Sequence, residues 1–243
     1  MRYLMTFSYD GTNFYGYQKQ KNKRTVQDEI ENVLSKINDK KISISASGRT
    51  DAGVHAINQK AHFDSSNEYD TDRLKHSMNK MLPDDIYIKN IKLVNDDFHA
   101  RFNVTRKKYV YKINVGEYNP LDRNYIYQYN WNLNVKKMSE AIKYFKGTHN
   151  FKSVTKTLKE EKDYNRTIYD IDLSVDNDII SIVFVGSGFM RYMVRNMVGL
   201  LIAVGEEKIE PSDIKEILEK EDRVFAKKTA PSEGLYLYDV YYE

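Results

Sequence analysis

The chain has 243 residues, of which 41% are hydrophobic, and its formal net charge is +3. This length fits one large or two modest domains with a proper hydrophobic core. The absence of cysteine excludes disulfides, thiolate chemistry and cysteine-ligated zinc, and it suits a reducing cytoplasm. We expect no membrane span, because no apolar run reaches about 18 residues, and the N-terminus has no signal-peptide pattern.

The five histidines are scattered and show no metal-ligand spacing, so the sequence predicts no metal site. The small net charge does not by itself indicate a nucleic-acid binder, but basic clusters lie at 19–24, 106–108 and 227–228. The chain also holds 20 tyrosines. Basic loops near aromatic side chains suit a phosphate backbone with unstacked bases, whereas an ordinary solvated lysine surface is the plain alternative.

Hydrophobic periodicity over the first half predicts the order strand, helix, strand, strand, helix, strand. The expected strands cover 3–9, 41–46, 59–64 and 86–94, and a further strand covers 108–115. We expect Thr25 to cap the first helix, with Asp28 in the capping-box place. The second helix is expected over 71–82, with an apolar face made of Leu74, Met78, Met81 and Leu82.

The second half is expected to follow a similar plan. We expect helices at 135–145, at 190–204 and from Pro211, strands at 167–175, 179–185 and 235–242, and a flexible polar surface segment at 148–166. The predicted fold class is therefore α+β, with two similar halves, each a mainly antiparallel sheet backed by helices, and a catalytic cleft between them. We place the domain boundary so that the domains are 1–115 and 116–243.

The stretch from Ser47 to Ala56 carries the strongest functional signal. It brings a carboxylate, a guanidinium, hydroxyls and an imidazole together, and Gly48 and Gly53 permit tight backbone geometry. It follows a predicted strand, and polar loops on a rigid scaffold are where catalytic groups concentrate. A tight turn with an Asp side chain bonding its own backbone is the structural alternative.

A second signal is the apolar segment 190–204, in which Arg191 and Arg195 stand four residues apart and so share one helix face. A buried guanidinium without an anion is costly, so Arg195 needs a carboxylate or phosphate, and Asp51 is a plausible partner. Such a pairing would lower the pKa of Asp51 and keep it ionised, fit to act as nucleophile or base. The alternative is that both arginines reach solvent at the helix edge. Glycosidases normally need two carboxylates that flank the bond to be cleaved. No second carboxylate stands in a setting comparable to that of Asp51, and Asp10 is the one other candidate.

A third signal is the interleaving of aromatic and cationic residues over 98–102 and 106–111. A tyrosine that projects from a strand beside cations, as Tyr109 does in the predicted strand, can stack on a base while the cations hold phosphate. The alternative for Tyr109 is an ordinary aromatic of a strand core.

These residues, taken together, resemble the tRNA pseudouridine synthases of the TruA type, from the first strand to the last. The matching segments are Tyr9-Asp10-Gly11, Gly16-Tyr17-Gln18, Thr25-Val26-Gln27, Gly48 to Ala56, His62-Phe63-Asp64, His99 to Phe102, Lys108 to Tyr111, Gly188 to Gly199, Ala230-Pro231 and Gly234-Leu235. The Arg-Thr-Asp loop is highly specific to this family.

The resemblance implies isomerisation of uridine to pseudouridine at tRNA positions 38, 39 and 40 in the anticodon stem-loop, without a cofactor or metal. It implies that Asp51 is the nucleophile, that Tyr109 stacks on the flipped base and assists removal of the C5 proton, and that Arg195 pairs with the aspartate. It also implies a homodimer with tRNA lying across both subunits. A base inside a stem must be extruded before it can react, and a loop-borne carboxylate in a basic, aromatic-lined cleft suits that task.

Further residues are expected to contact the RNA. The full set of RNA-binding candidates is Arg49, Tyr109, Lys19, Lys21, Arg24, His55, Arg101, Arg106, Lys107 and Arg191. Two positions depart from the family pattern: Lys60 stands where an apolar residue is common, and Asn150 replaces an aspartate. Neither is expected to touch the central loop.

Two other functions remain open from the residues alone. One is a non-catalytic module that binds or folds tRNA. The other is a hydrolase of small glycosides or nucleosides, which would bind its substrate with weak salt dependence because it would make few phosphate contacts.

Overall fold

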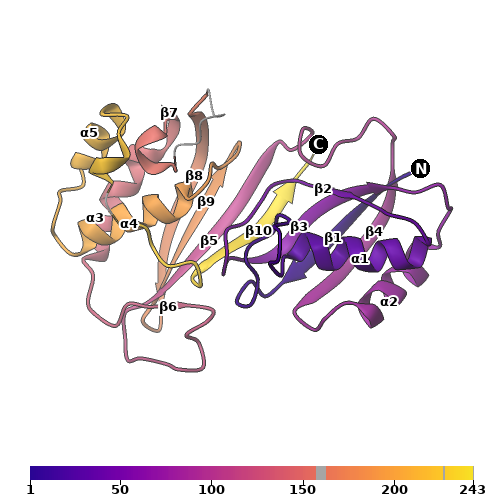
Figure 1. The fold of residues 1–243 in the computed structure, drawn as a ribbon. Helices are drawn as coiled ribbons and strands as arrows, with labels where there is room; N and C mark the ends of the chain where they lie inside the picture. Colours follow the sequence, from indigo (N-terminus) through magenta and orange to yellow (C-terminus); the bar gives the residue numbers. More distant parts are fainter. Residues whose placement is uncertain (157–162, 227, 243) are drawn as a thin grey trace. The chain divides into compact units, whose positions relative to one another are not determined.

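The fold of the chain is seen in a computed structural model, which describes residues 1–156, 163–226 and 228–242 (Figure 1). Part of the segment expected to form a polar surface, 157–162, and Lys227 of the third basic cluster lie outside the described residues. The chain forms two compact units, one of residues 1–105 together with 236–243 and one of residues 106–235. The sequence had placed the division after residue 115 and the last strand in the second domain.

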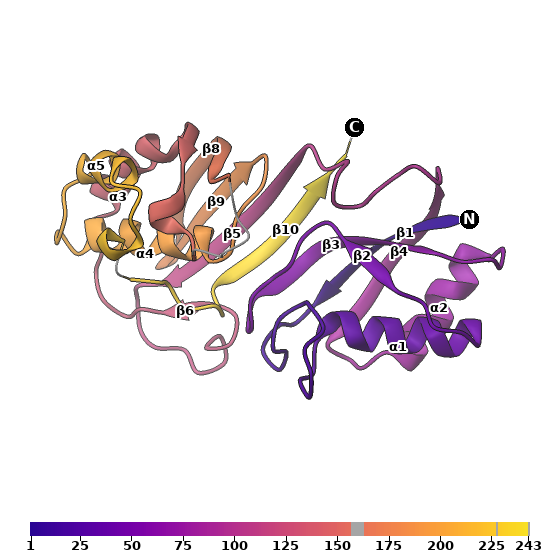
Figure 2. The same cartoon turned by 45° about the horizontal axis from the view of Figure 1, so that its top comes forward.

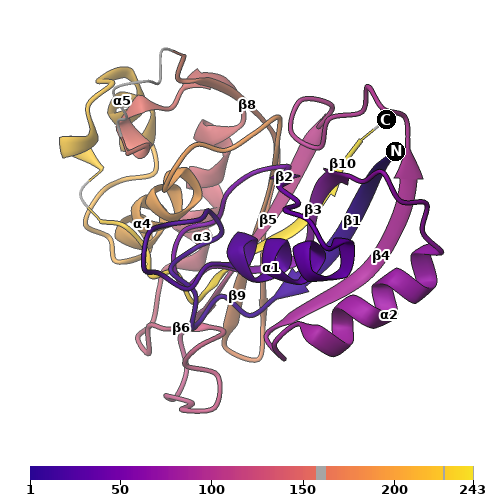
Figure 3. The same cartoon turned by 45° about the vertical axis from the view of Figure 1, so that its right-hand side comes forward.

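The first unit holds a sheet with the strand order β4-β1-β3-β10. These strands are β1 (Arg2–Tyr9), β3 (His55–Asp64), β4 (Ile86–Val94) and β10 (Leu235–Tyr241), and the short β2 (Ile44–Ala46) also pairs with β3. All pairs are antiparallel except β3 with β10. The helices α1 (Val26–Asn38) and α2 (Thr71–Met81) lie on one face of this sheet (Figure 3). The predicted order of the elements is confirmed.

Details of the helix ends differ from the predictions. Thr25 occupies the N-cap position of α1, but its hydroxyl makes no capping hydrogen bond and is buried without a partner. The predicted capping box with Asp28 is therefore wrong, since the side chain of Thr25 is fully buried instead of turned back onto the first turn. In α2 the N-cap is Asp70, whose carboxylate accepts two backbone N–H groups, and Met81 is 46% exposed instead of buried.

The second unit holds a sheet with the strand order β5-β9-β8-β7, in which these neighbours pair antiparallel, while the short β6 pairs parallel with β5. Its strands are β5 (Arg106–Asn114), β6 (Tyr127–Gln128), β7 (Gly147–Asn150), β8 (Asn165–Asp176) and β9 (Ile179–Gly186). Three helices cover it, α3 (Val135–Ala141), α4 (Met193–Gly205) and α5 (Asp213–Glu219), as Figure 2 shows. Short 3-10 turns lie at Ile142–Phe145, Lys152–Val154 and Arg223–Phe225. The predicted class of mainly antiparallel sheets backed by helices is confirmed.

Two predictions about the second unit are wrong. The segment expected to be a polar surface contains β7 and a 3-10 turn in its described part, and Phe151 and Val154 there are fully buried. Helix α4 begins at Met193, three residues later than expected, because Tyr192 before it has φ +63° in the left-handed region. Arg191 therefore lies outside the helix, and the shared helix face with Arg195 does not exist.

Glu206, at the C-terminal end of α4, provides a test of local stability in the second unit. Burial raises the pKa of its carboxyl, but hydrogen bonds from Lys208, Tyr129 and Lys228 outweigh burial and bring the pKa to about 2. A carboxyl with a depressed pKa stabilises the folded state above its unfolded pKa and loses that contribution as the pH falls toward the folded value.

We expect Glu206→Gln to lower the free energy of unfolding at pH 7 by about 1 kcal/mol, a value discounted because both lysines are well exposed. The difference from wild type should shrink as the pH falls from about 4.5 to 2. Urea unfolding at a series of pH values measures this. As a control, Glu219→Gln removes only an exposed pair with Lys215 and should change little. A pH-independent difference for Glu206→Gln would contradict the assignment.

Candidate active site

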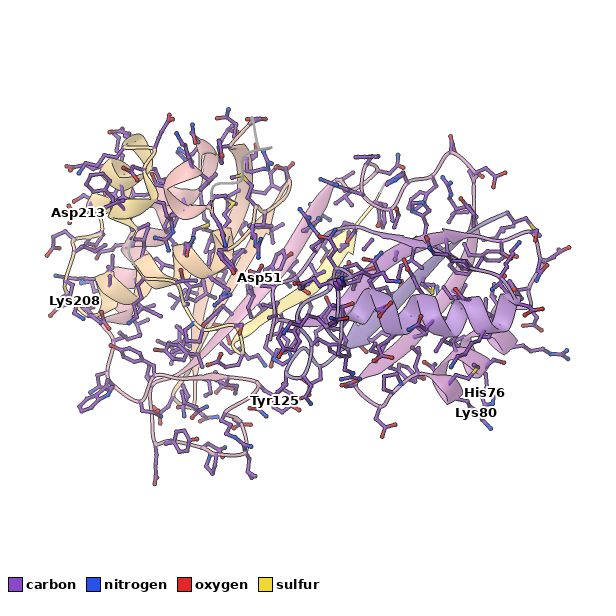
Figure 4. All side chains as sticks on the ribbon, in the orientation of Figure 1. Asp51, His76, Lys80, Tyr125, Lys208 and Asp213 are labelled. Carbon is purple, nitrogen blue, oxygen red and sulfur yellow. The ribbon has the colours of Figure 1, made fainter. Side chains whose placement is uncertain are left out.

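The loop between β2 and β3 carries Asp51 in the first unit. Asp51 is half-buried, and Figure 4 shows it at the end of this unit where α1 begins. A tight turn closes just after it, with the Val54 N–H donating to the Asp51 carbonyl at 3.2 Å. Gly53 within the turn has φ +76°, which a side chain would disfavour. The expected loop after a strand is therefore present, although β2 is only three residues long.

The loop preceding α1 is hydrogen-bonded to the Asp51 loop. The Tyr17 N–H donates to the Thr50 carbonyl at 3.1 Å, and the Gly53 N–H donates to the Phe14 carbonyl at 3.4 Å. Gly16, with φ +93°, allows this approach, because a Cβ there would lie 2.9 Å from the Thr50 carbonyl oxygen. The loop before α1, which is distant from Asp51 in the sequence, thus fixes the backbone on both sides of Asp51.

His55 begins β3 and is only 2% exposed. Its Nδ1 accepts the backbone N–H of Gly11 at 3.0 Å, and its ring stacks on Tyr236 at 4.8 Å. Asp10 lies 3.2 Å from the same ring nitrogen, and its carboxylate also accepts from the N–H and hydroxyl of Thr12. In the first unit His55 is a buried support of the loops, so its predicted contact with RNA does not fit its position.

The basic residues of the loop before α1 divide into two kinds. Lys19 pairs with Asp28 and Glu31, and Arg24 forms a bidentate pair with Asp85 and a third bond to Glu29. These charges are already neutralised within the unit, and they fasten the loop to α1 and to the turn before β4. Lys21 and Arg49 are exposed, and Arg49 donates to the side chain of Gln18 at 2.8 Å.

The segment after β4 presents Arg101 and an aromatic ring to solvent. Phe102 is 75% exposed and stacks on His99 at 4.2 Å, with the Arg101 guanidinium 5.8 Å from its ring. The backbone of this segment is held from below, since the Ala100 N–H donates to His62 and the Ala100 carbonyl accepts from Tyr242. Of the interleaved aromatic and cationic residues expected from the sequence, those at 98–102 lie on this turn, whereas those at 106–111 lie on β5.

In the second unit Tyr109 lies in β5 opposite Phe184 of β9. Its side chain is buried, and the edge of its ring meets Phe189 at 5.0 Å and 74°. Arg106 at the start of β5 is exposed and Lys107 is half-buried. Phe189 belongs to the segment that leads into α4, so it links the tyrosine to the residues that precede Arg195.

Arg195 is half-buried on α4, and its Nε donates to the Ala230 carbonyl at 2.7 Å. The guanidinium also lies over the Tyr192 ring, 5.2 Å from its centroid. Arg191, which is exposed, and Lys156 lie near the same ring at 5.2 and 5.7 Å. Arg195 is thus held by the backbone at Ala230, and three cations lie near the ring of Tyr192.

The sequence did not predict the groups that hold the Asp51 loop. Gln59 is fully buried in β3 and bonds to the first residues of the Asp51 loop. A polar amide between the apolar positions of a strand was the available signal. Lys60 directs its ammonium to the Val240 carbonyl, but its own backbone carbonyl accepts from Ser47, so it does touch the loop that it was expected to avoid. Asn150 accepts the N–H of Lys152 in a local turn.

In 1–156, 163–226 and 228–242 no three side chains of the histidine or carboxylate kind are placed to hold a metal ion. No helix of this part of the chain has the length and apolar character needed to cross a bilayer.

Comparison with known proteins places these residues in a family. A family model described as tRNA pseudouridine synthase matches residues 5–103 and 141–243. The chain is 44% identical over 244 residues to tRNA pseudouridine synthase A of Geobacillus sp. (strain WCH70), covering 100% of this chain and 98% of that protein. It is 43% identical over 246 residues to tRNA pseudouridine synthase A of Bacillus subtilis (strain 168), with 100% of both chains covered. A chain in the crystal structure of a Cbf5-Nop10-Gar1 complex matches with a TM-score of 0.37 and 11% identity over 82% of this chain and 54% of that chain, a likeness too low to carry an argument. The chain belongs to the tRNA pseudouridine synthase family.

Proposed function

We propose that this protein converts uridine to pseudouridine at positions 38, 39 and 40 of tRNA anticodon stem-loops. The observation that carries the proposal is the Arg-Thr-Asp loop between β2 and β3, whose backbone is fixed by hydrogen bonds to the loop before α1. It occurs in a chain with full-length similarity to tRNA pseudouridine synthases A. In the reaction the N1–C1′ bond breaks, the base turns, and a C5–C1′ bond forms, while C5 loses its proton and N1 gains one. The change is an isomerisation, so no electrons are gained or lost.

Three residues are proposed to act on the flipped base. Asp51 is the nucleophile, because a loop with fixed backbone can present one carboxylate in a constant direction. Tyr109 is proposed to stack on the base and to assist removal of the C5 proton. Arg195 is proposed as the cation partnered with the aspartate, the role that the sequence resemblance gives it, and its contact with the Ala230 carbonyl supports a fixed orientation of the guanidinium.

The proposed RNA surface uses the exposed cations. All of them are exposed: Lys21, Arg49 and Arg101 in the first unit, and Arg106 and Arg191 in the second. Lysine and arginine on phosphate release counterions, so binding should weaken as salt rises. We further propose that the protein works in the cytoplasm as a homodimer that binds tRNA across both subunits, on the resemblance alone.

The test is tritium release from tRNA transcripts labelled at uridine C5, with purified protein and no added metal or cofactor. Release with a full tRNA, and its steep loss between about 50 and 200 mM salt, supports the proposal. Binding of tRNA without release would make the protein a non-catalytic tRNA module. Turnover of free uridine or UMP at a comparable rate, with little salt dependence, would make it a small-molecule enzyme.

A further inference from the structure

Two buried side chains, Tyr9 and Gln59, are hydrogen-bonded to the Asp51 loop. Tyr9, the last residue of β1, is 4% exposed, and its hydroxyl lies 2.8 Å from the hydroxyl of Thr50. Thr50 is itself only 8% exposed and directly precedes Asp51. Burial raises the pKa of Tyr9 to about 12, so the phenol stays neutral at every pH at which tRNA is handled.

Gln59 braces the beginning of the same loop. Its Oε1 accepts from the Ser47 hydroxyl at 2.7 Å and from the Lys60 N–H at 3.0 Å, while its Nε2 donates to the Gly48 carbonyl at 3.1 Å. The Lys60 N–H fixes which way the amide points, because only an oxygen can accept from it. Gln59 and Tyr9 therefore hold neighbouring parts of one loop, Gln59 at Ser47 and Gly48 and Tyr9 at Thr50.

Thr50, the residue next to Asp51, is thus contacted both by Tyr9 and by the loop before α1. Thr50 is held by its carbonyl, which accepts from Tyr17, and by its hydroxyl, which pairs with Tyr9. Fixing the backbone and the side chain of one residue leaves the next residue few directions in which to point. A misplacement of about 1 Å at a reacting group can cost about 100-fold in rate.

We propose that Tyr9 is a positioning residue of the reaction, which directs the Asp51 carboxylate through its hydrogen bond with Thr50. The proposal rests on the proposed function, because it assumes that Asp51 reacts. It concerns turnover and not the binding of tRNA, since Tyr9 is buried and does not reach the RNA. Tyr9 is not proposed as an acid or base, because its hydroxyl is buried and paired with that of Thr50.

The first arm of the experiment compares Tyr9→Phe with Tyr3→Phe. Tyr3 lies at the other end of the same strand, is 1% exposed, and its hydroxyl accepts the Tyr69 N–H at 3.1 Å. Both variants lose one buried hydroxyl, so both should lower the melting temperature by similar amounts. We expect Tyr9→Phe to lower kcat by about 10- to 100-fold, with KM for tRNA within about twofold of wild type, and Tyr3→Phe to keep kcat.

The second arm tests the hydrogen bond from the other partner. Thr50→Val keeps the shape but loses the hydroxyl, and it should lower kcat as Tyr9→Phe does. Thr50→Ser keeps the hydroxyl and should restore most of the rate. The double variant Tyr9→Phe/Thr50→Val should be no slower than either single variant, because both remove one and the same interaction. The loss should be equal from about pH 6 to 9, since the Tyr9 phenol does not titrate there.

Three results would overturn the inference. They are a wild-type kcat in both Tyr9→Phe and Thr50→Val, an equal fall of kcat in Tyr3→Phe, and additive losses in the double variant. Asp51→Asn is measured alongside to distinguish a failure of the positioning role from a failure of the proposed function. An inactive Asp51→Asn beside fully active Tyr9 and Thr50 variants removes the positioning role and leaves the proposed function standing, whereas an active Asp51→Asn removes the function itself. If Tyr9→Phe does not fold, the Thr50→Val and Thr50→Ser pair decides the matter.

Discussion

Asp51→Asn is expected to abolish pseudouridine formation, lowering turnover on the order of 10⁴-fold or more, while the protein still folds. Asparagine has the same shape but no charged oxygen that can attack carbon. The fold should survive because the loop is held by backbone bonds to Tyr17 and Phe14 and by the side chain of Thr50, none of which needs the carboxylate. Tritium release at saturating tRNA measures turnover, and thermal unfolding measures the fold.

The matched control is Asp10→Asn, which changes the other carboxylate near the loop. The Asp10 carboxylate accepts from the N–H and the hydroxyl of Thr12, and the amide oxygen of asparagine can accept the same bonds. This variant should therefore retain most of the turnover. Normal release by Asp51→Asn would show that the attacking group lies elsewhere, and loss confined to the Asp10 variant would assign it to Asp10.

The elements of the first unit could be predicted because their signals are local. Alternating apolar residues gave β1 and β4 with bounds within one residue of those observed, and Thr25 was correctly placed at the N-cap position of α1. The errors occurred where tertiary contacts outweigh local preference. The Thr25 hydroxyl faces the core instead of capping α1, and β3 extends back to His55 because that residue pairs with the final strand, 181 positions later.

The start of α4 shows a different limit. Its apolar composition predicted a deeply buried helix, which the structure confirms, but a run of apolar residues does not reveal where the helical backbone begins. The left-handed conformation of Tyr192 sets that point and leaves Arg191 on the preceding turn. Tyrosine adopts that conformation only when its surroundings compensate for the cost, and the three cations around its ring form part of those surroundings.

The sequence singled out residues for the candidate site but not the groups that hold them. Arg49, Asp51, Tyr109 and Arg195 were singled out because charged or aromatic residues in such settings are costly or unusual, and their roles stay predictions. Gln59, Tyr9 and the Ala230 carbonyl were not found, because a hydrogen bond between residues distant in sequence leaves no periodic trace. Among the candidates for RNA binding, the sequence could not distinguish exposed residues from paired or buried ones. The structure shows Lys19 and Arg24 in ion pairs and His55 buried.

Tyr109→Phe is expected to keep the affinity for tRNA and to lower turnover by about 10² to 10⁴-fold. Phenylalanine retains the ring that meets Phe189 edge-on and that would stack on the base, so binding and folding should persist. Only the hydroxyl is lost, and with it the group proposed to help remove the C5 proton. Single-turnover tritium release with enzyme in excess measures the chemical step, and filter binding of tRNA measures the affinity.

Tyr111→Phe is the matched control, two residues along β5 and therefore on the same face of the strand. The Tyr111 hydroxyl donates to the Pro231 carbonyl at 2.8 Å, and burial raises the pKa of its phenol well above the ordinary value. This variant should lose stability by about 1 kcal/mol and keep its rate, because the hydroxyl serves the packing of the 230–234 segment. Equal losses of rate in both variants, or a parallel fall of affinity and rate in Tyr109→Phe, would mean that the Tyr109 hydroxyl holds structure and does not move the proton.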